Sequence, residues 1–246
     1  MKKTLLILIT TSLLSCGKSS GNNNETEKKE ATPPSLADAS ACILGYQTKL
    51  DQLLPLEIIQ KHYTGDMSKA KKKYNYRPEA KKHDMDMDTY EYTWESSRSR
   101  KMKMMGQEMD VPTPNRIGLK WVGSDLFMIN KKATPLECFK AFYRNASAAE
   151  KEAAFKKAGE TLKEKGYDEK TTKTATDMAK DLSADEIIFK DISGVGEAAS
   201  WRIKDKYLTV LVGKITFQIL ADVSTNDEEN ITLAKKLALE VLNKCK

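Results

Sequence analysis

Apolar and polar residues alternate along the chain near residue 90. Tyr90, Tyr92 and Trp94 would share one face of an extended segment, while polar residues such as Glu91 would occupy the other. A period of two with one apolar face is typical of a half-buried β-strand. The alternation continues at four further positions, Arg98, Arg100, Met102 and Met104. We therefore expect one long strand whose far end is more polar.

Two more strands are predicted after this one. The segment "MDVPTPN" ends the alternation with two prolines, and proline is poorly tolerated inside a sheet. A return strand fits residues 116–123, and residues 125–131 fit a third strand. One face of the return strand would carry Ile117, Leu119 and Trp121.

The segment before these strands contains one helix and one irregular stretch. Pro55 can open a helix, and apolar residues recur at helical spacing from there to Tyr63. Residues 66–84 are rich in lysine and follow no clear period, so we expect them to be irregular.

The middle of the chain, residues 134–183, is predicted to hold three helices. The first carries Phe139 and Phe142 on one face. The segment "SAAE" opens the second as a capping box, in which the serine and the glutamate each bond a backbone N–H group of the other. An aspartate caps the third helix. The apolar stripe of that helix would consist of Ala175, Met178, Ala179 and Leu182.

Four strands and a closing helix are predicted after this block. The strands fit residues 186–192, 198–203, 207–213 and 214–223. A turn at Gly213 makes the last two a hairpin, and Asn226 with Asp227 begins the helix. The helix has a wide apolar stripe, made of Ile231, Ala234, Leu237, Ala238, Val241 and Leu242.

The order of these elements predicts the fold class. Strands that are joined by short turns favour an antiparallel sheet, and the helices must cover at least one of its faces. We expect an α+β fold with a mainly antiparallel sheet covered by helices. The helical insertion at about 134–183 is a candidate lid. Residues 36–246 would form a single domain, which is long enough for a sizeable core.

The first sixteen residues resemble an export signal. Two lysines precede an apolar run of about ten residues, which is too short to span a bilayer. Residues 13–16 read "LLSC", and they resemble the lipobox of bacterial lipoproteins. That resemblance implies cleavage between Ser15 and Cys16, removal of residues 1–15, and acyl chains on Cys16 that anchor the protein in a membrane.

The segment after the lipobox is predicted to be a tether. Residues 17–35 contain no aromatic and no large apolar residue, so Cys16 and this segment would form a disordered link to the folded domain. Gly17, and not aspartate, follows the cysteine. By resemblance to the sorting rule of many Gram-negative lipoproteins, this favours the outer membrane over the inner membrane.

Composition limits the partners that we expect. The net charge is +6, with 40% apolar and 31% charged residues. Acidic and basic residues are interspersed, which argues against a nucleic-acid surface. Besides the membrane that holds the acyl chains, we expect a protein or glycan partner in the cell envelope.

Three cysteines would remain after acylation of Cys16. Their spacing matches no zinc or redox motif. Because the termini of a domain are often close in space, we favour a disulfide between Cys42 and Cys245. A pairing of Cys42 with Cys138, and three buried thiols without a disulfide, are the alternatives.

The C-terminal third resembles small bacterial envelope lipoproteins with a PsbP-like fold. The residues that carry the resemblance are the "GVGEA" turn at Gly194–Ala198, the strand and apolar hairpin that follow it, and the closing helix. The segments "LLPLEII" and "YEYTW" match the start of the same layout. The resemblance implies a sandwich of sheet and helices, and it implies no particular activity.

One segment suggests a metal site. Residues 83–88 read "HDMDMD", and further methionines follow as far as residue 109. Imidazole and thioether groups are suitable ligands for copper. A periplasmic copper-handling protein that uses His83, Met85 and Met87 is therefore the alternative function. Methionines at such spacing usually pack, so we expect no metal or other cofactor.

No catalytic motif is present in the sequence. The glycine pair at Gly194 and Gly196 lacks the remaining residues of a dinucleotide or phosphate loop, and a turn explains it. His62 is expected at a helix end. A basic cluster, which we interpret as a solvated strand end with anionic lipid or polysaccharide as the alternative, comprises Arg98, Arg100, Lys101 and Lys103. We therefore expect a binding or structural module and not an enzyme.

Overall fold

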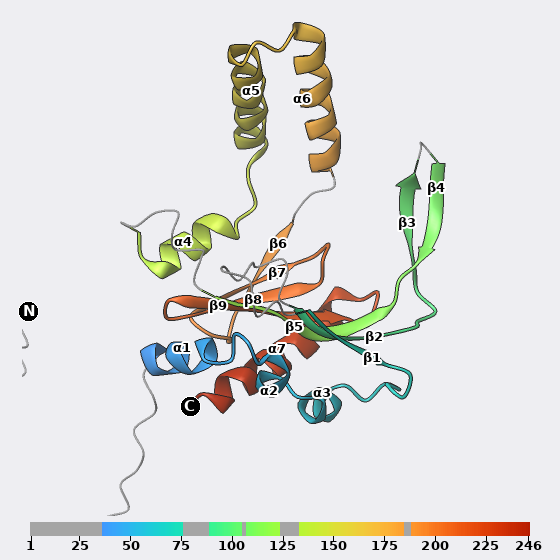
Figure 1. The fold of residues 1–246 in the computed structure, drawn as a ribbon, viewed down its shortest axis with the longest axis vertical. Coiled ribbons are helices and arrows are strands. Elements are labelled where there is room, and N and C mark those ends of the chain that lie inside the picture. Colours follow the sequence, from blue (N-terminus) through green and yellow to red (C-terminus); the bar gives the residue numbers. More distant parts are fainter. Residues whose placement is uncertain (1–35, 76–88, 105–106, 124–132, 185–187) are drawn as a thin grey trace, which may run out of the picture. The chain divides into compact units, whose positions relative to one another are not determined.

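Seven antiparallel strands form the main sheet of the protein, in the order β1-β2-β5-β9-β8-β7-β6 (Figure 1). The computed structural model describes residues 36–75, 89–104, 107–123, 133–184 and 188–246, which all belong to the unit Pro33–Lys246. The strands are β1 (Lys71–Asn75), β2 (Thr89–Trp94), β5 (Asn115–Gly123), β6 (Phe189–Ile192), β7 (Ala198–Arg202), β8 (Tyr207–Val212) and β9 (Ile215–Asp222). The predicted α+β class with a mainly antiparallel sheet is confirmed.

Four helices cover one face of this sheet (Figure 1). They are α1 (Leu36–Leu44), α2 (Leu50–Leu53), α3 (Leu56–His62) and α7 (Asp227–Lys244). The predicted stripe of α7 is buried except for Leu242, which is half-buried, and Asn226 caps the helix by accepting from the N–H of Glu228. Trp201 and Phe217 of the sheet are fully buried beneath the helices. Burial of each such side chain contributes ~1.5–3 kcal/mol.

The predicted long strand is wrong, because the chain turns after Trp94. A separate two-stranded sheet follows, formed by β3 (Ser99–Met104) and β4 (Gln107–Pro112). Ser96 is the physical reason for the turn. Its hydroxyl donates to the Thr113 carbonyl at 2.6 Å, and it accepts from the N–H of Arg98 at 3.0 Å. Pro112 is tolerated because it ends a strand at an edge.

The first strand of the sheet lies in the stretch that we expected to be irregular. β1 has the sequence "KKKYN" and pairs only with β2 within the described sheet. Its lysines are exposed, so no apolar alternation marks the strand. Exposed lysines on an edge strand also discourage pairing with another chain.

A β-bulge changes the face on which Trp121 lies. The register shifts between Leu119 and Val122, and Trp121 has a φ of 108°. Val122 therefore joins Leu119 in the main core, while the Trp121 indole donates to the hydroxyl of Thr216 at 3.2 Å. The expected face with Trp121 beside Leu119 is wrong, because one extra residue in the strand reverses the alternation.

The helical insertion contains α4 (Pro135–Phe142), α5 (Ala148–Glu164) and α6 (Glu169–Ala184). The predicted capping box of Ser147 and Glu150 is present, and Arg144 also binds the Glu150 carboxylate at 2.6 and 2.8 Å. Asp168 accepts from the N–H of Thr171 and so caps α6. The boundary signals in the sequence therefore identify these helices correctly.

The faces of two inserted helices differ from the prediction. In α4, Phe139 is buried with Tyr143 against Leu211 on the other face of the sheet, whereas Phe142 is 49% exposed. α5 and α6 pack chiefly against each other. Their contact uses small residues, namely Gly159, Thr172 and Thr176, and the predicted stripe residues Ala175, Met178 and Ala179 are exposed. Small residues let two helices approach closely, which overrides the apolar stripe.

A disulfide joins the two ends of the folded unit. Cys42 in α1 and Cys245 after α7 are bonded, with their Cα atoms 5.7 Å apart. This is the pairing that the closeness of domain termini favours. Cys138 is buried in α4 and belongs to no disulfide.

Candidate functional site

A polar cleft with an aromatic wall opens where β2 ends. Its volume is about 470 Å³. The residues come from the α3–β1 connection, the end of β2 and the start of β5. We call it the Trp94 cleft, and its lining is Tyr63, Asp66, Lys69, Trp94, Glu95, Ser96, Ser97 and Asn115.

The register of two strands brings the cleft together. Trp94 of β2 lies directly opposite Asn115 of β5. Side chains of directly opposed residues stand on the same face of a sheet. The ring of Tyr63, the residue that follows α3, packs against Trp94 with centroids 5.5 Å apart and an interplanar angle of 57°. Trp94 is 7% exposed, so the aromatic wall is held firmly by the core.

Charged groups stand beside the aromatic wall. The carboxylate of Asp66 accepts from the N–H of Ser68 at 2.8 Å, which lowers the pKa of that carboxyl. Partial burial raises the pKa of the Tyr63 hydroxyl. Lys69 and Glu95 are exposed at the cleft. The lining therefore contains a cation, two carboxylates and a phenol that stays protonated at neutral pH.

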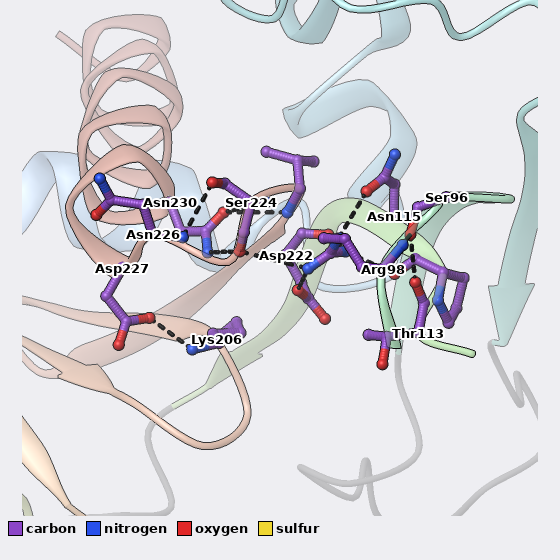
Figure 2. Close-up of polar contacts among 12 residues, drawn as sticks. Ser96, Arg98, Thr113, Asn115, Lys206, Asp222, Ser224, Asn226, Asp227 and Asn230 are labelled. Carbon is purple, nitrogen blue, oxygen red and sulfur yellow. Dashed lines mark hydrogen bonds and ion pairs between the residues drawn. The ribbon is translucent and has the colours of Figure 1, made fainter. Parts of the chain in front are cut away.

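Arg98 binds Asn115, one of the residues that line the cleft (Figure 2). Its guanidinium donates to Asp222 Oδ1 at 2.6 Å and to Asn115 Oδ1 at 3.2 Å. It also donates to three backbone carbonyls, those of Asp222 at 2.8 Å, Pro114 at 2.9 Å and Ser224 at 3.3 Å. The side chains of Arg98 and Asp222 are only 13% and 12% exposed. We call Arg98, Asp222, Asn115, Ser96 and Thr113 the Arg98 clamp.

The clamp fixes two residues of the cleft. Ser96 is held by its bonds to Arg98 and Thr113, and the N–H of Thr113 donates to the Arg98 carbonyl at 2.9 Å. A guanidinium can only donate, so the amide oxygen of Asn115 must face Arg98. The amide nitrogen of Asn115 then points away from the clamp (Figure 2). The cleft thus contains an N–H donor with a fixed orientation.

A second polar layer holds the far end of the clamp. Asn230 of α7 is fully buried, and its side-chain oxygen accepts from the N–H groups of Val223 and Ser224 at 3.0 Å (Figure 2). Its amide nitrogen donates to the Ser224 carbonyl at 2.8 Å. Lys206 pairs with Asp227 at 2.5 Å. These contacts fix the chain between β9 and α7, and they thereby hold Asp222, the ion-pair partner of Arg98.

The structure places the predicted site residues in different environments. Arg98 does not belong to an exposed basic cluster, because the chain turns at Ser96 and buries it. Arg100 and Lys101 are exposed, as expected for a strand end. His62 ends α3, where its Nε2 lies 2.7 Å from Glu240 of α7.

Several predictions lie outside the described residues. These are the signal segment, Ser15, Cys16, the tether and the candidate metal ligands His83, Met85 and Met87. The predicted strand at 125–131 also lies there. Within the described ranges, no three His, Cys, Asp or Glu side chains gather closely enough to hold a metal ion.

The Trp94 cleft was missed by sequence reasoning. Its residues come from three separate segments, and the periodic patterns that contain Tyr63 and Trp94 give no sign that these two residues meet. The one usable signal in the sequence is the pair Ser96 and Ser97, because serine favours turns and a turn after Trp94 creates the cleft.

Comparisons with known proteins return nothing for this chain. No family model, no curated protein and no solved structure matches it. Among the helices that the structure describes, none combines the length and the apolar character that a membrane span requires.

Proposed function

We propose that the protein is a lipid-anchored binding module of the bacterial cell envelope. Acyl chains on Cys16 would hold it in a membrane, the outer membrane by preference, and the α+β domain would take its ligand in the Trp94 cleft. The resemblance of residues 13–16 to a lipobox supports the anchor.

The disulfide between Cys42 and Cys245 is the observation that carries this proposal. Disulfides persist in oxidising compartments and are rare in the cytosol of mesophiles. A chain that is exported and then anchored at a membrane would lie in such an oxidising compartment. The bond also joins the helix nearest the tether to the last helix of the domain.

Two features of the cleft support the proposed binding role. Its volume of about 470 Å³ lies within the range of ligand pockets. The pKa of Asp66 is lowered and that of Tyr63 is raised, so both shifts move away from neutrality. A general acid or base works best with a pKa near the working pH, and these two groups do not meet that requirement.

Labelling with radioactive palmitate tests the anchor. The full chain, expressed in a bacterium, should incorporate the label, and Cys16→Ala should abolish it. Cys138→Ala is the matched control and should keep the label. Labelling that persists in Cys16→Ala would refute the anchor. Full reactivity of Cys42 and Cys245 towards an alkylating agent, in unreduced and denatured extracts, would refute the oxidised state.

A further inference from the structure

We propose that the ligand of the Trp94 cleft is a neutral saccharide. This inference rests on the proposed function, because it names the ligand class of the same cleft. It is carried by the mixture of hydrogen-bonding groups around the aromatic wall.

The half-buried ring of Tyr63 offers an apolar surface next to polar groups, and Trp94, which is only 7% exposed, supports that ring from the core. Tyr63 and Trp94 are packed against each other and against the core. Aromatic rings combine a large apolar area with little conformational freedom to lose. A sugar ring presents C–H groups on its faces and hydroxyl groups around its edge, so it can contact both kinds of surface at once.

The polar groups of the cleft serve both roles in hydrogen bonding. Asp66 and Glu95 can only accept when ionised, whereas Lys69 and the amide nitrogen of Asn115 can only donate. The hydroxyl of Ser97, exposed at the cleft, can do both. Sugar hydroxyl groups also donate and accept, so they can satisfy all of these groups.

The same mixture disfavours a charged ligand. An anion would meet the carboxylates of Asp66 and Glu95. An organic cation would meet the ammonium of Lys69 and the fixed N–H donors of Asn115, which the Arg98 clamp orients. A neutral ligand with many hydroxyl groups meets no such repulsion.

The clamp also makes the site preorganised. The amide of Asn115 cannot flip, because its oxygen is bound to Arg98 at 3.2 Å. Ser96 is fixed in the same way by Arg98 and Thr113. A group that is already ordered loses less freedom on binding, which favours affinity.

The test is calorimetric titration of the full chain in detergent micelles. The probes are neutral trisaccharides of glucose, galactose and N-acetylglucosamine. At least one should bind at micromolar to millimolar concentration. The double variant Asp66→Asn/Glu95→Gln should weaken that binding about tenfold or more, because bonds to charged acceptors are stronger than bonds to neutral ones.

Two controls separate binding from folding, and a further variant reports on the cleft itself. Both substitutions keep an acceptor oxygen, so the turn at Asp66 survives, and circular dichroism should show an unchanged melting temperature. Glu164→Gln, at an exposed position of α5, should leave the affinity unchanged. Trp94→Phe should remove the ligand-dependent change in tryptophan emission.

Three outcomes would overturn the inference. The first is no binding of any trisaccharide at millimolar concentration. The second is binding that the double variant does not alter. The third is binding of spermidine or tetramethylammonium that the double variant abolishes, which would make the ligand a cation. In that case the proposed binding function would stand and only the saccharide would be wrong. The anchor is tested separately, by the palmitate labelling described above.

Discussion

Removing the guanidinium of Arg98 should destabilise the protein strongly. Arg98→Met keeps much of the side chain's apolar stem but removes all five bonds of the guanidinium. The carboxylate of Asp222, 12% exposed, would then be left without its ion-pair partner. Breaking a buried pair in this way costs ~3–5 kcal/mol.

An exposed ion pair in the neighbouring hairpin provides the control. Lys101 of β3 and Glu108 of β4 form a diagonal ion pair at 3.5 Å, with side chains 69% and 63% exposed. Such pairs contribute ~0–1 kcal/mol. Lys101→Met removes one positive charge, as Arg98→Met does. It should nevertheless change the free energy of unfolding by less than about 1 kcal/mol.

Urea unfolding followed by circular dichroism measures both variants. For a domain of this size, a loss of 3–5 kcal/mol corresponds to a fall in melting temperature of roughly 6–20 °C. The double variant Arg98→Met/Asp222→Asn should be less destabilised than the sum of the single variants, by ~0.5–3 kcal/mol. An Arg98→Met protein that loses no more stability than Lys101→Met would refute the reasoning.

Three further predictions concern the disulfide, a helix cap and the glycine turn. Serine at Cys42 and Cys245 should lower the free energy of unfolding by about 3–5 kcal/mol, because the bond closes a sequence separation of 203 residues; urea midpoints equal to those of the oxidised protein would contradict this. The Glu150 carboxyl should titrate in a carbon-13 NMR experiment with a pKa of about 2, because an arginine side chain and the capping serine donate to it. This pKa lies below the unfolded value of 4.5, so the cap's contribution is complete above that value and is lost as the pH falls towards 2; a midpoint near 4.5 would disprove the cap. Gly194→Ala should cost ~1–2 kcal/mol because its φ is 81°, and Gly196→Ala should cost ~1–3 kcal/mol more because its Cβ would lie 2.4 Å from a carbonyl oxygen. Equal urea midpoints for the two variants would be inconsistent with that contact.

The elements that were predicted correctly carry several signals at once. α7 has an Asn226 cap, a wide stripe and a C-terminal cysteine on the buried side, and β8 with β9 have a glycine turn between two apolar runs. Each signal alone is weak, but their agreement leaves few other structures open to the segment. These elements form the part of the fold that local sequence determines.

The errors arise where tertiary contacts decide between local alternatives. The alternation after Trp94 is a true strand pattern, but it does not specify the partner strand, which a few hydrogen bonds at Ser96 determine. The stripe of α6 is apolar, yet Thr172 and Gly159 allow a closer approach and become the contact face. The bulge before Val122 reverses one side chain without any change in composition.

The Trp94 cleft shows why a binding site of this kind cannot be predicted from one sequence. Trp94 and Asn115 meet because the β2–β5 register pairs them directly, and a slip of one residue would bring a side chain from the other face opposite Trp94. Arg98 determines the amide orientation of Asn115. The alternation pattern had placed Arg98 in the polar end of a long strand and gave no sign of this role. The register depends on the buried face of β2, and the amide orientation depends on an ion pair with Asp222 at the far end of β9. The chemistry of the cleft is therefore a property of long-range contacts, and substitution of Arg98 or Asp222 should alter ligand binding although neither residue lines the cleft.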